Sequence, residues 1–286
     1  MSKKQLLSIV RSTCVAAAVL AVATPALAQD DERELGSANS TELGLVLTAG
    51  NSNTANFNVR NLYAYNWENA DLDWEFGILR ASSGDDRFAV GNEDDFELIE
   101  PDTEPDNSRI FTNIRYTRNI NSRFFWYARA FAERDEPADI DYRVTPSVGA
   151  GNTWIDNETH RFRTGYGVSY TAEELKLEGG SSFVGYQLFY ELNSAVAGST
   201  TVESNLTWDG SFEEAGDYRF DWLNGVGVSM TDTIALKASL RLVYRNQPAL
   251  EEIDLQTEIL AIPIGKVIVP KKKLDTAFTT SLVISF

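Results

Sequence analysis

Apolar and polar residues alternate with a period of two along much of the chain. From Val184 to Leu192, and again from Ile234 to Tyr244, every second residue is apolar, while most of the residues between them are small, polar or charged. Such alternation predicts β-strands with one apolar face and one polar face. These runs are longer than the usual strand of about five or six residues. Strands of roughly ten residues, tilted near 45°, are long enough to cross a bilayer.

Extended along the chain, the alternation predicts twelve antiparallel strands. They lie at 41–49, 54–67, 72–82, 108–120, 124–133, 142–154, 159–171, 182–193, 200–212, 218–229, 234–245 and 275–286. The strand at 124–133 fits the pattern least well, because Phe124 to Phe131 is apolar on both faces.

The lengths of the links between these strands also alternate, except that the links 50–53 and 213–217 are short for external loops. Four of the links are long, namely 83–107, 134–141, 172–181 and 246–274, and short links separate them. Short periplasmic turns that alternate with long external loops are typical of an outer-membrane barrel with both termini inside. We therefore expect an all-β, transmembrane, up-and-down β-barrel in the bacterial outer membrane.

A soluble β-sandwich also alternates with a period of two. Here, however, aromatic residues flank the apolar faces: Tyr142 and Trp154 share a face with Val144 and Val148. Aromatic girdles around an apolar band belong to membrane barrels. The chain ends on an alternating strand with Leu282, Ile284 and Phe286 on one face, which resembles the signal read by the outer-membrane assembly machinery. These features favour the barrel over the sandwich.

The start of the chain has the pattern of a secretory signal peptide. Lys3, Lys4 and Arg11 precede a short apolar stretch that contains Cys14, the one cysteine, and Ala26-Leu27-Ala28 supplies the small residues of a cleavage site. A spanning helix would need about 20 apolar residues. We expect residues 1–28 to be cleaved, 29–39 to form a short N-terminal segment, and 40–286 to form the barrel.

The formal net charge of −17 argues against nucleic acid as a partner, because nucleic-acid binding needs a basic surface. The strand register nevertheless turns many basic residues inward, since the opposite register would place Lys237 and Arg241 in lipid at roughly 2–4 kcal/mol each. The charged residues expected to line the lumen are Arg60, Arg115, Arg129, Arg143, Arg163, Arg219, Lys237, Arg241, Asp73, Glu75, Glu133, Glu191 and Asp221, with Arg109, Arg161, Arg245, Glu42, Glu203 and Asp209 on the same faces or at the rim.

Two interpretations of these inward charges remain open. Paired arginines and carboxylates would fill the lumen and hold the barrel closed, because buried charges must pair. Alternatively, the arginines would line a narrow passage for small anionic or zwitterionic solutes. The closed barrel is slightly favoured, since barrel interiors are polar whatever their role.

Motifs for catalysis or metal binding are weak. The one histidine, His160, lies near a predicted periplasmic turn, and neither a G-x-S-x-G nor an H-E-x-x-H motif is present. We expect no enzyme activity, no cofactor and no dedicated metal site, although carboxylates of the loop 83–107 offer oxygen ligands to Ca²⁺. Those carboxylates are Asp85, Asp86, Glu93, Asp94 and Asp95.

The link 246–274 mixes apolar residues with Lys271, Lys272 and Lys273. It is expected either to form a hairpin at the rim or to plug the lumen, and its basic run is a candidate contact for lipopolysaccharide phosphates. The expected partners are thus outer-membrane lipid, lipopolysaccharide and, during biogenesis, the barrel-assembly machinery. The sequence does not indicate an oligomeric state.

Three stretches resemble one family. They are the segment GLVLTAGNSNT at 44–54, Asp141-Tyr142-Arg143-Val144 with Gly149-Ala150-Gly151, and Leu274-Asp275-Thr276. They resemble the YdiY-like salt-induced outer-membrane proteins, a family defined by a domain of unknown function, over about 40–286. The resemblance implies the fold and the location, and it brings no catalytic or binding residues. A role in the response to salt or envelope stress is implied by the family name alone.

Overall fold

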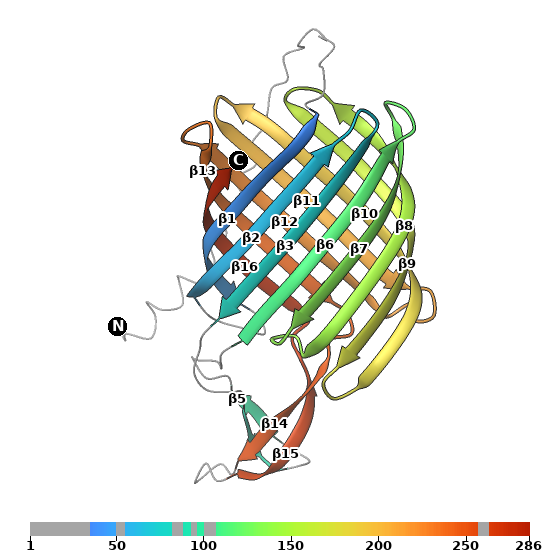
Figure 1. The fold of residues 1–286 in the computed structure, drawn as a ribbon. Coiled ribbons are helices and arrows are strands. Elements are labelled where there is room, and N and C mark those ends of the chain that lie inside the picture. The colour runs from blue at the N-terminus through green and yellow to red at the C-terminus, as the bar shows by residue number, and fades with distance from the viewer. Residues whose placement is uncertain (1–34, 50–54, 82–87, 93–95, 100–106, 257–262) are drawn as a thin grey trace, which may run out of the picture. The chain divides into compact units, whose positions relative to one another are not determined.

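The computed structural model describes residues 35–49, 55–81, 88–92, 96–99, 107–256 and 263–286. Twelve antiparallel strands close into a barrel (Figure 1), which confirms the predicted fold class. No helix in these ranges is long and apolar enough to span a membrane. The barrel strands are β1 (Gly36–Ala49), β2 (Ala55–Asn66), β3 (Ala70–Ala81), β6 (Asn107–Asn119), β7 (Phe124–Asp135), β8 (Ile140–Asp156), β9 (His160–Leu175), β10 (Gly179–Ala197), β11 (Thr200–Ser211), β12 (Tyr218–Ser229), β13 (Ile234–Arg245) and β16 (Leu274–Ser285).

The first and last strands of the barrel pair with each other and close it. β1 runs antiparallel to β16, with Ser40 opposite Ser285 and Ala49 opposite Thr276. β1 begins at Gly36 instead of the predicted 41, because residues 36–39 of the expected N-terminal segment already pair with β2. The predicted signal peptide, residues 1–28, lies outside the described residues.

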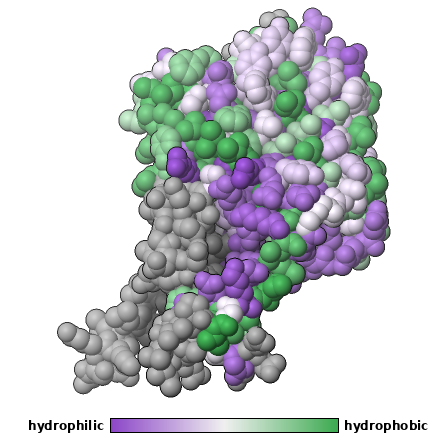
Figure 2. All heavy atoms as spheres, turned by 60° about the horizontal axis from the view of Figure 1, so that its bottom comes forward, coloured by the Kyte–Doolittle hydropathy of each residue, from purple (hydrophilic) through white to green (hydrophobic). Residues whose placement is uncertain are grey.

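The wall of the barrel has its polar residues inside and its apolar residues outside. In β8, Val148 is 59% exposed, whereas Arg143 on the opposite face is 5% exposed. Figure 2 turns the end of the barrel that carries the long links forward, and shows hydrophilic side chains around that end and hydrophobic ones spread over the wall. A strand that places charge inside and aliphatic residues outside suits a lipid environment.

The two apolar faces of β7 have different environments. Phe124 and Trp126 are exposed on the outside, while Phe125 and Tyr127 are fully buried and cluster with Phe189 of β10. The rings of Tyr127 and Phe189 meet edge to face, with their centroids 5.1 Å apart. The inward aromatic rings therefore fill part of the lumen, which explains why β7 lacks the usual polar face.

Glycines on the inner faces of β8 and β9 make room for these rings. A Cβ atom added at Gly149 would lie 2.2 Å from the carbonyl oxygen of Tyr166 and 2.8 Å from Cε1 of Tyr127. At Gly151, the added Cβ would lie 2.3 Å from Cζ of Phe125 and 2.4 Å from the carbonyl oxygen of Thr164. Because part of each obstacle is backbone, a side-chain rotation alone does not relieve the clash.

We expect Gly149→Ala to lower the free energy of unfolding by about 1–3 kcal/mol, the usual cost of overpacking. Urea unfolding of the folded protein in lipid vesicles measures this change. Gly265→Ala is the matched control, because a Cβ atom at Gly265 meets nothing within 4 Å. Equal stability of both variants would show that the inner face of β8 tolerates a side chain at position 149.

The long links supply a second, four-stranded sheet in the order β15-β14-β4-β5. Its strands are β4 (Phe88–Gly91), β5 (Phe96–Ile99), β14 (Leu250–Gln256) and β15 (Pro263–Pro270). β14 and β15 form the hairpin that was one of the two expectations for 246–274, while the link 83–107 contributes strands that the sequence did not predict. β14 pairs in parallel with β4, and Ala89, Ile253, Leu255 and Val269 form the buried core of the sheet.

Candidate functional site

The candidate site is a cavity of about 250 Å³ inside the barrel. Every barrel strand except β9 contributes to its lining, which contains eight arginines and six carboxylates. No described residue of 246–274 belongs to this lining, so the described part of that link does not plug the cavity. The alternation of the strands thus produces a small, highly charged compartment.

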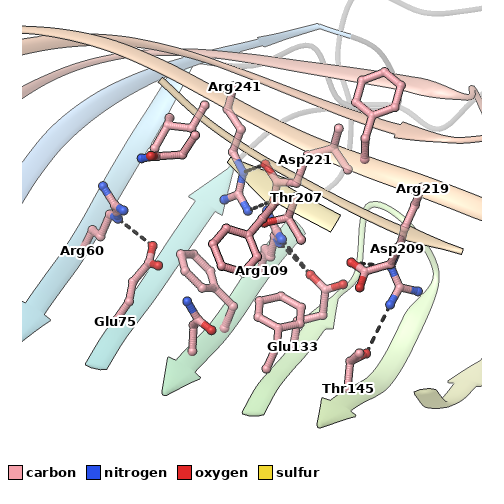
Figure 3. Close-up of a pocket in the computed structure, with 18 of the residues that line it drawn as sticks. Arg60, Glu75, Arg109, Glu133, Thr145, Thr207, Asp209, Arg219, Asp221 and Arg241 are labelled. Carbon is pink, nitrogen blue, oxygen red and sulfur yellow. Dashed lines mark hydrogen bonds and ion pairs between the residues drawn. The ribbon is translucent and has the colours of Figure 1, made fainter. Parts of the chain in front are cut away.

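The structure places all of the charged residues expected in the lumen on the inner face of the barrel. Figure 3 shows part of this arrangement, with Arg60 facing Glu75, Arg241 facing Asp221, and Arg109 facing Glu133. Lys237, near the start of β13, binds Glu42 at 2.7 Å and Glu203 at 2.6 Å. The ion pairs and the cavity lining that show this placement include Arg60, Asp73, Glu75, Arg115, Arg129, Glu133, Arg143, Arg163, Glu191, Arg219, Asp221, Lys237 and Arg241.

Some of the ion pairs connect neighbouring strands along the wall. Nε of Arg60 on β2 lies 2.7 Å from Oε1 of Glu75 on β3. Nε of Arg143 on β8 lies 2.6 Å from Oε2 of Glu173 on β9. Such pairs hold two adjacent strands in register and leave the opposite wall free.

Other contacts cross the lumen. Nη2 of Arg245 on β13 lies 3.1 Å from Oδ2 of Asp135 on β7, and these two strands are six positions apart in the closed order of twelve. The guanidinium of Arg241, also on β13, lies 5.3 Å from the ring centroid of Phe111 on β6. The two walls are therefore joined by side chains that reach across the lumen, and Arg245 and Asp135 do so from the last positions of their strands.

A second bridge crosses the barrel at another place. Arg115 on β6 binds Glu191 on β10, four positions away in the closed order, and Arg163 donates to the other oxygen of Glu191 at 2.8 Å. Arg115 also binds Asp73 at 3.0 Å. Glu191 thus joins two arginines from different walls.

Glu133 joins the most buried part of the network. Its carboxylate accepts hydrogen bonds from Arg109 at 2.7 Å and from Arg143 at 3.1 Å, and the Glu133 side chain is only 4% exposed. In a low-dielectric interior each of these charge-assisted bonds is strong, and each charge is costly if left alone. The network therefore stabilises the fold only as long as it is complete.

Two cavity arginines have weaker partners than the others. Arg129 donates from Nε to Oδ1 of Asn113 at 2.6 Å and makes no ion pair with any described residue. Arg219 donates to the hydroxyls of Thr145 and Thr171, and its nearest carboxylate contact, Asp209, is 3.9 Å away. The cavity lining thus has a local excess of positive charge.

Comparison with known families identifies the chain. A family model described as "Protein of unknown function, DUF481" matches residues 41–286. The chain belongs to this family. The resemblance seen in the sequence is thereby confirmed, and a search of curated proteins found no match.

Solved structures similar to this DUF481 barrel are porins and other outer-membrane barrels. The NanC porin aligns with a TM-score of 0.50 and 8% identity over 85% of this chain and 98% of that chain. The KdgM porin aligns with a TM-score of 0.41 and 10% identity, over 86% of this chain and 99% of that chain. At these identities the similarity to the NanC porin shows the fold alone, which is that of an outer-membrane barrel.

The sequence missed several inward acids of this DUF481 barrel. Asp71, Asp135 and Glu173 were assigned to links, but each is buried and reaches an arginine on the inner face. The signal was present, because Glu173 continues the inward alternation of Ser169 and Thr171 to the end of β9 at Leu175. Asp275 at the start of β16 also belongs here, since it binds Arg245 at 3.1 Å.

Lys271 does not stand free as a candidate for lipopolysaccharide binding. It lies 3.0 Å from Asp139 and 3.2 Å from Glu251, donates to the carbonyl oxygen of Pro137 at 2.9 Å, and is 11% exposed. Asp139 has a φ of +53°, a left-handed conformation that aspartate tolerates better than most residues. Lys271 therefore connects the β14–β15 hairpin to the β7–β8 turn.

The remaining candidates lie outside the cavity. Nδ1 of His160 lies 2.6 Å from Oγ of Ser194, its partner across β9 and β10. Leu282 and Phe286 are exposed on the outside of the closing strand and its end, where a role in assembly stays a prediction.

The candidate Ca²⁺ ligands Asp85, Asp86, Glu93, Asp94 and Asp95 lie outside the described residues. Among the described residues no group of His, Cys, Asp or Glu is arranged to hold a metal ion.

Two carboxyl groups, in the turns that follow β7 and β11, have shifted pKa values. Glu136, in the β7–β8 turn, accepts hydrogen bonds from Oγ and the backbone N–H of Ser108, which lowers the pKa of its carboxyl group. Burial raises the pKa of the Asp217 carboxyl group in the β11–β12 turn, with the nearby negative charge of Glu173 adding to the effect. The β7–β8 turn is therefore held by the contact between Glu136 and Ser108 as well as by strand pairing.

Proposed function

We propose that this protein is an outer-membrane barrel whose lumen is closed at rest by its own arginine–carboxylate network, and that it serves the envelope as a closed barrel and not as an enzyme. The observation that carries the proposal is the contact between Arg245 and Asp135. This ion pair, 3.1 Å long, joins strands on opposite sides of the barrel. Together with the Arg115–Glu191 bridge, it obstructs the lumen with charged side chains.

The outer face supports a location in lipid. Val148, Val168 and Leu236 are exposed on the wall, where no described part of the protein covers them. Trp154 and Tyr142 lie toward opposite ends of β8, as interfacial aromatic residues do. The proposed partners are thus outer-membrane lipid, with lipopolysaccharide on the outside, and the assembly machinery during biogenesis. The family resemblance adds salt or envelope stress as the proposed setting.

A second candidate function is a narrow passage for small anionic or zwitterionic solutes. The observation that favours it is the local excess of eight arginines over six carboxylates around a cavity of about 250 Å³. Rings of basic side chains select anions in pores. This alternative requires the cross-lumen pairs to separate during conduction.

Single-channel recording in a planar bilayer distinguishes the two functions. We expect the purified wild-type protein, inserted at many copies per bilayer, to give no discrete conductance steps, because its cross-lumen pairs stay closed. Folding and insertion are checked by the reduced electrophoretic mobility of the protein after heating and by protease protection. Discrete steps with a reversal potential that indicates anion preference would contradict the closed barrel and support the passage.

A further inference from the structure

Arg129, on the inner face of β7, differs from the other arginines of the cavity. Nε donates to the neutral Oδ1 of Asn113 at 2.6 Å, and the guanidinium lies over the ring of Phe131, 5.7 Å from its centroid. Within the described ranges, neither of its terminal nitrogens has a carboxylate partner. Arg129 is thus a positioned cation with no ion-pair partner among the described residues, and Glu75, the acid with which its charge does interact, is bound to Arg60 at 2.7 Å.

The strand register explains why no carboxylate reaches Arg129. The residues directly opposite it are Arg115 on β6 and Ser147 on β8. Arg115 uses its own terminal nitrogens for Asp73 and Glu191. Glu75, which interacts electrostatically with Arg129, is bound to Arg60 at 2.7 Å. Like charges directly opposite each other on neighbouring strands are destabilising. An anion bound at Arg129 would relieve this repulsion.

The orientation of the guanidinium suits an anion with two oxygens. Because Asn113 engages Nε, the two terminal nitrogens remain to donate in parallel, and Arg129 belongs to the lining of the 250 Å³ cavity. Two parallel N–H donors match the spacing of carboxylate or phosphate oxygens. The cavity has the volume of roughly eight waters at about 30 Å³ each, which exceeds that of a small oxyanion.

We propose that Arg129 anchors a binding site for a small oxyanion in the lumen, namely a carboxylate, phosphate or sulfate group. Asn58, Asn205 and Thr207 line the same cavity and supply neutral hydrogen-bond donors. The proposal goes beyond the closed barrel, because binding at this site is measured on the folded protein whether or not the lumen conducts. Absence of conductance and absence of binding are thus separate results.

Isothermal titration calorimetry of inorganic phosphate into the detergent-purified, full-length protein tests the site. Wild-type protein is expected to bind phosphate saturably. Arg129→Gln is expected to bind it at least about tenfold more weakly, because the positive charge and the parallel N–H donors of the guanidinium are both lost. The matched control is Arg118→Gln, since Arg118 is an exposed arginine elsewhere on the same strand pair. Its phosphate affinity is expected to equal that of the wild type.

Parallel titrations with sulfate and acetate define the preferred oxyanion. Arg129→Lys keeps the positive charge but lacks the two parallel N–H donors of the planar guanidinium, so we expect it to bind each anion more weakly than the wild type does. This variant decides the question if Arg129→Gln does not fold. The proposal is overturned if none of the three anions binds to the wild type, or if the folded Arg129 variants bind them with unchanged affinity.

Discussion

Glu133→Gln is expected to lower the free energy of unfolding by about 3 kcal/mol, at the low end of the 3–5 kcal/mol typical when one partner of a buried pair is removed. The glutamine leaves Arg109 and Arg143 without a shared negative charge in a site where the Glu133 side chain is 4% exposed. The loss is moderated because Arg109 keeps Asp135 at 3.4 Å and Arg143 keeps Glu173 at 2.6 Å. Urea unfolding in lipid vesicles, followed by tryptophan fluorescence, measures it.

An exposed ion pair supplies the control for this experiment. Glu252 and Lys266 form a contact of 2.5 Å on the four-stranded sheet, with side chains 40% and 60% exposed. Water screens such a pair, so Glu252→Gln is expected to leave the unfolding midpoint unchanged. If Glu133→Gln behaved in the same way, the lumen network would have to be as solvated as the surface, which would contradict its role in closing the barrel.

The sequence predicts the barrel well because the alternation of residues reports directly on the two faces of each strand. In β13, Lys237 and Arg241 alternate with Leu236 and Leu240, so the cost of charge in lipid leaves one register. The same rule, applied past the expected strand ends, also places Asp135 and Glu173 inside. The predicted strands end before these residues, which is why the prediction leaves them out.

The ion-pair partners of the lumen residues cannot be predicted in the same way. Alternation tells which face a residue occupies, but it does not tell which residue lies across the barrel. Lys237 binds Glu42, 195 residues away, and Arg245 binds Asp135, 110 residues away. Such pairs depend on the closure of twelve strands and on side-chain length. Likewise, the parallel pairing of β14 with β4 joins two links that carry no shared pattern.

For Arg129 too, the sequence predicts the direction of the side chain but not its partners. Its inward direction follows from the sequence, since it alternates with Ala128 and Ala130 on β7. That it forms no ion pair with a described residue follows only from the register, which places Arg115 opposite it, and from the engagement of Glu191 and Asp73 by Arg115. The inward direction of a charged residue therefore does not reveal whether an oppositely charged partner reaches it.

Removing the cross-lumen pairs is expected to open the barrel to ions. The variant replaces Arg245, Asp135, Arg115 and Glu191 by serine, which removes both bridges with equal numbers of positive and negative charges. Both partners of each bridge are removed together, so neither leaves its direct counterpart behind as a buried lone charge. Arg163, which also binds Glu191, keeps only Asp71 at 4.0 Å, so folding of the variant is checked before recording. Discrete conductance steps should appear in planar bilayers where the wild type gives none. More arginines than carboxylates remain in the cavity lining, so anions should carry most of the current.

The matched control removes two wall pairs, with Arg60, Glu75, Arg143 and Glu173 replaced by serine. These pairs join β2 to β3 and β8 to β9, which are neighbours, so the loss of charge is the same while both cross-lumen bridges remain. This variant should insert and stay silent. Conductance in the control alone, or silence in both folded variants, would show that Arg245–Asp135 and Arg115–Glu191 do not close the lumen. Conductance confined to the first variant would instead assign the closure to these two bridges, since the two variants differ in the span of the pairs and not in their number or charge.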